Sequence, residues 1–334
     1  MKRFVISAAA MTAFASVPAV AQGVSSSCPG GSPTSAAQVS QDACQQTIDL
    51  FMYMAPQLGT AIAGGNATLG MGGTLGGLGH FSVGLRANAV AGSVPEVDQV
   101  TPGITGAQRR TYQTSTIPVP MATADLAIGV WQGLPLGLTN VGGIDVLVSG
   151  TYIPAYDDDN VSVDPDTPFK FGYGVRIGAL QESILVPGVS VTYLKRDLPR
   201  MSLSAQVTTD SLIVRALDVQ TSAWRVVVSK SLIMFGVAAG IGQDTYKSGA
   251  TAQGIVNRSI LGVAGRFPSP VIAQDQDITR TNMFADISFN LPFVKIVGEI
   301  GQASGGAVET FNSFADKAAD ASRLYGSLGI RIGW

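Results

Sequence analysis

The sequence predicts an all-β protein, a membrane-spanning antiparallel up-and-down β-barrel of about ten strands (with a range of ten to fourteen), preceded by a short helical N-terminal segment. Three observations lead to this fold class. Apolar and polar residues alternate in about ten separate segments. Only 13% of residues are charged and the mean hydropathy is +0.29, yet past the N-terminal region no stretch approaches the ~18 apolar residues of a transmembrane helix. The connections between the segments are alternately short and long.

The first 21 residues are predicted to be a cleaved signal peptide. Lys2 and Arg3 are positively charged, Phe4–Val20 is apolar and rich in alanine, and a small-x-small motif ends at Ala21. The alternative, an uncleaved membrane anchor, is disfavoured because the apolar region is short and polar residues follow it. The signal peptide places the mature chain in an exported compartment.

Residues 22–77 do not alternate, and they are predicted to form a plug or a periplasmic segment. A short helix is expected from Gln38 to about Gln57, with Pro56 near its end. As a plug the segment would enter the barrel from the periplasm, and otherwise it would cap the periplasmic mouth.

Two further features of this segment are local. Cys28 and Cys44 are the only cysteines, and in an exported chain they are expected to form a disulfide. The glycine-rich stretch Thr60–Gly79 is interpreted as permissive backbone rather than a phosphate-binding loop, because no strand and helix flank it in the required order.

The barrel is predicted to span residues 78–334, and its last strand is the most informative. Leu328, Ile330, Ile332 and Trp334 share one face, with small or charged residues between them. This amphipathic strand ending on an aromatic residue resembles the C-terminal insertion signal of bacterial outer-membrane barrels. The resemblance implies the cell outer membrane of a Gram-negative bacterium, with membrane lipid and the barrel-assembly machinery as partners.

The other nine strands follow the same alternation, more weakly in some. We expect them near residues 79–90, 126–130, 144–152, 169–179, 189–193, 224–228, 235–242, 282–290 and 294–300. The intervening long connections lie near residues 92–119, 155–167, 196–212, 245–275 and 302–321. With an even number of strands, both barrel ends fall on the short-turn, periplasmic side.

The inward-facing positions carry charges of both signs. The residues predicted to line the lumen are Arg86, Asp125, Asp145, Lys170, Arg176, Arg225, Asp286, Glu299 and Arg331. They could form a polar pore or pair across strands and fill the interior. The narrow interior of a ten-stranded barrel favours pairing.

Six aromatic residues are candidates for interfacial girdles. These are Trp131, Tyr152, Tyr173, Trp224, Tyr325 and Trp334, although Trp131 is expected to face inward.

Catalysis, cofactors and metals are not predicted. His80, the only histidine, and Ser82 resemble the residue pair of the outer-membrane phospholipase, but His80 is interpreted as a lumen residue because no oxyanion-hole context accompanies it. Asp157–Asn160 with Asp164 and Asp166 is interpreted as a solvated acidic loop rather than a calcium site. A net charge of −2 without a basic block argues against nucleic acid as a partner.

The order of signal peptide, N-terminal helical segment and barrel resembles the long-chain fatty-acid transporter family in layout, although those barrels have about fourteen strands. The resemblance implies porin-like transport of small solutes, hydrophobic or polar, across the outer membrane. A non-conducting structural barrel of the envelope is the alternative, and a barrel hydrolase is the third reading.

Overall fold

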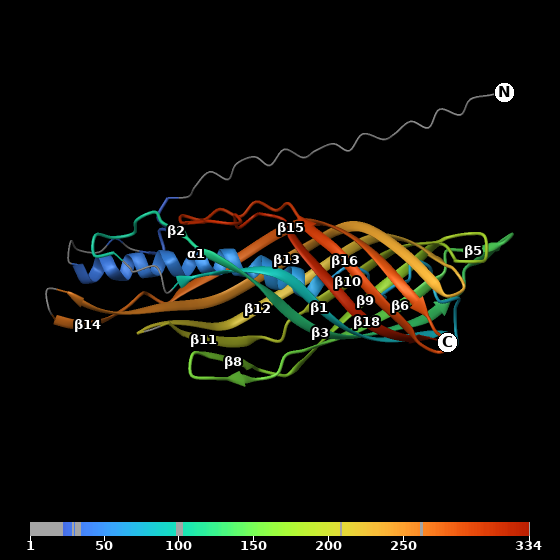
Figure 1. The fold of residues 1–334 in the computed structure, drawn as a ribbon, viewed down its shortest axis with the longest axis horizontal. Coiled ribbons are helices and arrows are strands. Elements are labelled where there is room, and N and C mark those ends of the chain that lie inside the picture. The colour runs from blue at the N-terminus through green and yellow to red at the C-terminus, as the bar shows by residue number, and fades with distance from the viewer. Residues whose placement is uncertain are drawn as a thin grey trace, which may run out of the picture.

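The computed structural model describes residues 23–28, 30, 35–97, 103–207, 209–260 and 263–333. The predicted signal peptide and Trp334 lie outside the described residues. Within these ranges the chain forms one long helix and an extended antiparallel sheet that closes on itself (Figure 1). The all-β fold class is therefore confirmed.

Ten strands form the closed ring. Each pairs with the next in an antiparallel register, and the pairing of β12 with β13 completes the circle. In ring order they are β1 (Phe81–Pro95), β3 (Thr114–Trp131), β6 (Ile144–Tyr152), β9 (Phe169–Leu180), β10 (Gly188–Asp197), β12 (Asp210–Ser231), β13 (Phe235–Ile260), β15 (Ile272–Asn290), β16 (Lys295–Ser304) and β18 (Arg323–Gly333). The number of ring strands in the described residues matches the expected ten.

The remaining strands are short and lie outside the ring. Three of them, with β14, continue the sheet beyond it, and the other four pair as two small sheets. They are β2 (Thr111–Tyr112), β4 (Leu134–Leu136), β5 (Thr139–Val141), β7 (Tyr156–Asp157), β8 (Val161–Pro165), β11 (Met201–Val207), β14 (Val263–Pro268) and β17 (Ser313–Phe314).

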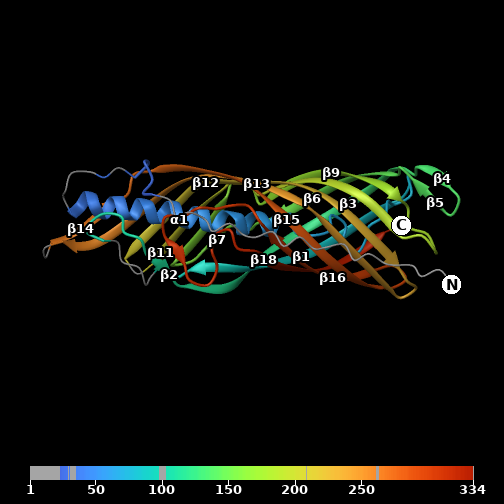
Figure 2. The ribbon, with the colours of Figure 1, turned by 90° about the horizontal axis from the view of Figure 1, so that it is seen from above.

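The two ends of the barrel differ. One end, here called the short-turn end, holds the tight connections and the β4–β5 hairpin. At the other, the long-loop end, β12 and β13 run far beyond their neighbours and pair with β11 and β14. Figures 1 and 2 show the resulting elongated molecule, with the β4–β5 hairpin at one end and β14 at the other.

Helix α1 (Ser35–Ala63) occupies the interior of the long-loop half. It contacts β1, β3, β10, β12, β13, β15 and β18, and most of its residues are buried, including Asp42, Asp49 and Gln57. In Figures 1 and 2 the helix lies lengthwise among the strands, at the end opposite the β4–β5 hairpin. The helix therefore starts at the long-loop end and runs into the barrel, whereas we expected either a plug that enters from the short-turn end or a segment that caps that end.

The expected long connections are shorter than predicted because strands continue through them. Most of residues 245–275 belongs to β13, β14 and β15, and part of 92–119 belongs to β1 and β3. Past Ile241 the outward positions of β13 become polar, beginning with Gln243 and continuing to Lys247. Strand pairing continues there without an apolar face, so the hydropathy alternation that reveals a strand disappears.

The outer surface carries the predicted apolar rows. Leu328, Ile330 and Ile332 of the C-terminal strand are each about half exposed or more on the outside. No helix of the described residues is long and apolar enough to cross a membrane.

Two aromatic residues point opposite to expectation. Trp131 is 45% exposed, because a β-bulge between Gly129 and Trp131 reverses the alternation. Tyr325 is buried and its hydroxyl donates to Asn282 Oδ1 at 2.6 Å inside the barrel.

Candidate functional site

An apolar pocket of about 620 Å³ lies between α1 and the protruding strands of the long-loop half. One wall is the helix face that carries Leu50, Phe51, Met54 and Leu58. The opposite wall is formed by β11, β12 and β13, and the end of β1 contributes as well. The wall residues from these strands include Leu203, Leu212, Val214, Leu217, Ile255, Val94 and Pro95. A volume of this size lies within the range of roughly 300–1,000 Å³ that suits small-molecule ligands.

The charged residues of the pocket lie together at one corner. Arg258 Nη2 lies 3.1 Å from Asp210 Oδ2, and Asp210 Oδ1 accepts from the backbone N–H of Asn257 at 2.9 Å. The two charges compensate each other, so the corner adds no net charge to the apolar walls. The pocket therefore favours a ligand that is mostly hydrocarbon.

Long connections cover the other side of α1. Strands β2 and β17, from the connections after β1 and β16, pair in parallel, and Phe314 stacks on Tyr53 of the helix with ring centroids 3.7 Å apart. The Tyr53 hydroxyl lies 2.8 Å from Ser93 Oγ and 3.1 Å from the Lys317 carbonyl. These contacts hold the helix at a fixed depth in the barrel.

Asp49 ties the same connection to the helix. Its carboxylate accepts hydrogen bonds from the backbone N–H groups of Phe311 and Asn312 and from the side chains of Asn312 and Gln45. Burial raises the pKa of Asp49 above its usual value, although these hydrogen bonds lower it.

Pro56 lies inside the helix and does not end it. A proline at this position has no N–H to give to the carbonyl of Met52, one turn earlier. That carbonyl instead accepts from the Gln276 side chain of β15 at 3.1 Å. The missing helical bond is thus replaced from the barrel wall, and the helix continues to Ala63.

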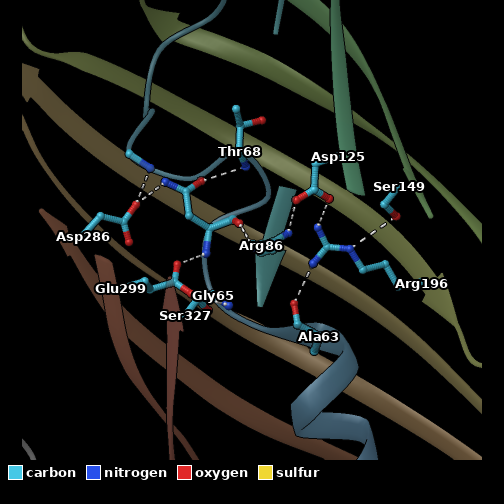
Figure 3. A network of polar contacts seen from close by, with 12 residues as sticks. Ala63, Gly65, Thr68, Arg86, Asp125, Ser149, Arg196, Asp286, Glu299 and Ser327 are labelled. Carbon is cyan, nitrogen blue, oxygen red and sulfur yellow. Dashed lines mark hydrogen bonds and ion pairs between the residues drawn. The ribbon is translucent and has the colours of Figure 1, made fainter. Parts of the chain in front are cut away.

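Arginine and asparagine side chains from the wall surround the C-terminal end of α1. The Ala63 carbonyl accepts from Arg196 Nη1 at 3.0 Å and from Arg225 Nη2 at 3.3 Å, and the Gly64 carbonyl accepts from Asn282 at 3.0 Å. Cations at a helix C-terminus compensate both the unpaired carbonyls and the helix dipole. The end of the helix is therefore anchored at mid-barrel (Figure 3).

Carboxylates bind the next residues through their N–H groups. Glu299 accepts from Gly65 at 3.1 Å and from Asn66 at 2.5 Å, and Asp286 accepts from Gly70 at 2.8 Å and from the Asn66 side chain at 2.7 Å. Figure 3 shows both carboxylates directed at this turn. A Cβ on Gly65 would lie 2.3 Å from the Glu299 carboxylate, so the close approach requires glycine.

The glycine-rich segment then fills the rest of the lumen down to the short-turn end. The Leu75 N–H donates to Asp145, which also pairs with Arg176 at 2.7 Å. A Cβ on Gly129 of β3 would lie 2.2 Å from the Gly77 carbonyl. The chain packs directly on the inner wall, and a small cavity of about 10 Å³ remains beside Thr68, Arg86 and Asp125.

The structure places eight of the nine predicted lumen residues on the inside of the wall. Most of them pair with each other or with the plug, which consists of α1 and the glycine-rich segment after it. The eight are Arg86, Asp125, Asp145, Arg176, Arg225, Asp286, Glu299 and Arg331. The ninth, Lys170, is exposed at the start of β9, near the long-loop end.

Four further charged residues of the wall face inward, and the sequence pattern did not predict them. Arg196 bridges Asp125 at 2.8 Å, Asp244 pairs with Arg225 at 2.8 Å, and Arg280 and Arg323 are fully buried. All four lie beyond the apolar rows, near or in segments expected to be loops. Extending the strict alternation from Thr192 or Gly242 would have placed Arg196 and Asp244 inside.

The remaining candidates lie in different surroundings. His80 is exposed at the short-turn rim rather than in the lumen, whereas Ser82 is buried and its Oγ has no hydrogen-bond partner among the described residues. Asp157, Asp158 and Asp159 are exposed at the β7–β8 hairpin, and the described residues hold no cluster of side chains suited to a metal. The expected Cys28–Cys44 disulfide is present.

Comparison with known proteins gives only distant similarities. The chain matches no protein-family model and no curated protein. Among solved structures it is similar to a TodX deltaS2S3 mutant, a monoaromatic hydrocarbon channel, with 9% identity over 83% of this chain and 97% of the other and a TM-score of 0.31. It is also similar to the outer-membrane channel DcaP of Acinetobacter baumannii, with 10% identity over 79% and 100% of the two chains and a TM-score of 0.20. These values are too low to transfer a function, so the functional argument depends on the site itself.

Proposed function

We propose that this chain is a Gram-negative outer-membrane protein that binds a small hydrophobic solute in the apolar pocket and passes it across the membrane. The pocket of about 620 Å³ beside α1 is the observation that carries the proposal. Its walls are mostly aliphatic, and the one ion pair at its corner is internally neutral. The long-loop end, which holds the pocket, would face the exterior.

Passage requires the plug to move, because the segment after α1 packs against the inner wall. Its anchors are hydrogen bonds rather than a covalent link, and the glycine-rich chain can adopt many backbone conformations once released. A solute bound beside Phe51 and Leu58 contacts the same helix whose end is held by Arg196 and Arg225. Binding and release of the plug would be coupled through α1.

The filled lumen also supports the second candidate, a non-conducting barrel that stabilises the envelope. The inward charges pair with each other and with the plug, as a purely structural interior requires. Such a protein has no need for a pocket that accepts a ligand.

Equilibrium binding of radiolabelled hexadecanol to the refolded mature protein tests the proposal, with radiolabelled glucose as the polar comparison. We expect saturable binding of the alcohol and none of the sugar. The variant Leu203→Glu places a charge on the pocket wall and should weaken binding by at least about tenfold, since a buried unpaired charge is costly.

Val271→Glu serves as the matched control. Val271 is 58% exposed between β14 and β15 and does not line the pocket, so this variant should bind as the native protein does. Unsaturable binding, or equal binding by both variants, would remove the basis for the hydrophobic-solute function and leave the structural barrel in its place.

A further inference from the structure

Three neighbouring turns at the short-turn end carry large apolar side chains that are exposed. They connect β9 to β10, β12 to β13 and β15 to β16, which are consecutive among the connections at this end of the ring. We call this surface the apolar rim and define it by Ile184, Leu185, Leu232, Ile233, Met234, Leu291 and Phe293. The exposed fractions reach 93% for Ile184, 99% for Ile233 and 78% for Phe293.

Two charged side chains beside the rim are hydrogen-bonded to its turns and to neighbouring strands. Lys230 donates to the carbonyls of Ser183 and Ile184 at 2.5 and 2.7 Å, and Glu182 accepts from Ser229 Oγ at 2.8 Å and from the Ser231 N–H. Both charged side chains therefore bind turn backbone and neighbouring strands. The apolar side chains are left as the outermost groups.

Part of the backbone of the turns is hydrogen-bonded internally. The Leu232 and Leu291 N–H groups donate across their own turns, at 2.6 and 2.9 Å. Asn290 then links two turns: its backbone N–H donates to the Met234 carbonyl at 2.8 Å and its side chain to the Leu232 carbonyl at 3.2 Å. Each internal hydrogen bond of this kind lowers the cost of moving the turn backbone from water into a lipid environment.

The height of the lipid-facing surface also indicates that these turns contact lipid. On β13 the outward apolar row runs from Phe235 to Ile241, which is about 20 Å along a strand and about 15 Å along the barrel axis at the usual tilt. Above it the surface turns polar at Gln243, which pairs with the interfacial candidate Trp224 of β12. An outer-membrane barrel presents an apolar band of about 25 Å, so about 10 Å is missing along β13.

From these observations we infer that the apolar rim is immersed in the inner leaflet and completes the hydrophobic band on this side of the barrel. The occupant of the rim is lipid, because the rim continues the lipid-facing rows of β13 and β15, and on β12 only Lys230 interrupts the row. The periplasmic water boundary then lies beyond the turns rather than above them. This inference rests on the membrane insertion contained in the proposed function.

Site-directed spin labelling of the full mature protein in phosphatidylcholine vesicles tests the inference. The only two cysteines form a disulfide, so Ile233→Cys or Phe293→Cys provides a single reactive thiol. We expect labels at both sites to collide with oxygen and to be shielded from a water-soluble nickel chelate. Val237→Cys, within the outward row, and Asp158→Cys, in the exposed hairpin, provide the lipid and water references.

The labels at residues 237 and 158 distinguish the outcomes that would contradict the inference. Chelate access at residues 233 and 293 with lipid exposure at 237 would overturn the immersion of the rim but leave membrane insertion intact. Chelate access at 237 as well would overturn insertion and the proposed function with it. Shielding of 233 and 293 from both reagents would show a covered surface and would also overturn the lipid assignment.

Discussion

Glu299 binds the plug directly, because it accepts hydrogen bonds from two successive backbone N–H groups, those of Gly65 and Asn66. It also accepts from Ser327 Oγ of the wall at 2.9 Å. Glu299→Gln keeps the shape of the side chain but replaces one acceptor oxygen with a donor that faces N–H groups. We expect the free energy of unfolding to fall by about 1–3 kcal/mol, the usual cost of leaving buried groups unsatisfied. Urea unfolding of the refolded protein in detergent micelles measures it.

The matched control is Asp277→Asn. Asp277 pairs with Lys247 at 3.3 Å, but both side chains are more than half exposed, so the loss should be at most about 1 kcal/mol. Equal losses in the two variants would show that the Glu299 contacts contribute no special stability.

Asp49 provides a pH-dependent prediction at the same scale. Burial raises its folded-state pKa above the unfolded value, so the folded protein binds this proton more readily than the unfolded chain does. The contribution of Asp49 to stability is then greatest below about pH 4 and is lost as the pH rises through the raised pKa. Asp49→Asn cannot titrate, so its unfolding free energy should decline less between pH 4 and pH 7 than that of the native protein.

The comparison uses the difference between two urea-unfolding series, in which other titrating groups cancel. Parallel pH profiles for Asp49→Asn and the native protein would contradict the assigned shift.

At the scale of elements, the disulfide joins the start of α1 to the segment before it. Cys28 and Cys44 are 16 residues apart, and a loop of about that length is expected to contribute roughly 3 kcal/mol through the unfolded chain. The helix start also packs on the protruding strands, where Ser40 Oγ donates to the Pro268 carbonyl at 2.9 Å. The helix end is held separately by Arg196 and Arg225.

Replacing both cysteines by serine should therefore loosen α1 from its start. We expect hydrogen–deuterium exchange to accelerate over residues 35–46 and to change little over 53–63. Uniform acceleration along the helix would mean that the two anchors are not independent.

For the whole molecule, the central question is whether the lumen conducts once the plug is removed. α1 and the glycine-rich segment occupy it from the long-loop half to the short-turn end. We expect the full mature protein to be nearly silent in planar bilayers, and a barrel that begins at residue 78 to show raised single-channel conductance. Heat-modifiable migration on a denaturing gel verifies that the shortened barrel has folded.

A folded but silent barrel would favour the structural function over transport. High conductance of the full-length protein would instead contradict the plugged state.

The ring of ten strands, the outward rows and the Cys28–Cys44 bridge could be predicted from the sequence. A membrane imposes a period of two on each strand, and that constraint is local, so it can be recognised from a few neighbouring residues such as Leu328, Ile330 and Ile332. The even strand count and the alternation of short and long connections follow from the same constraint.

Only the tertiary structure decided the direction of the plug, the partners of the charges and the existence of the pocket. The contacts of Asn66 with Asp286 and of Ala63 with Arg225 join residues more than 150 positions apart, and they exist only after the barrel has closed. Arg196 and Asp244 lie above the lipid-facing rows, where water on the outside removes the hydropathy pattern although pairing continues. The pocket is formed by α1, β11, β12 and β13 together, so no single segment of the sequence carries its signature.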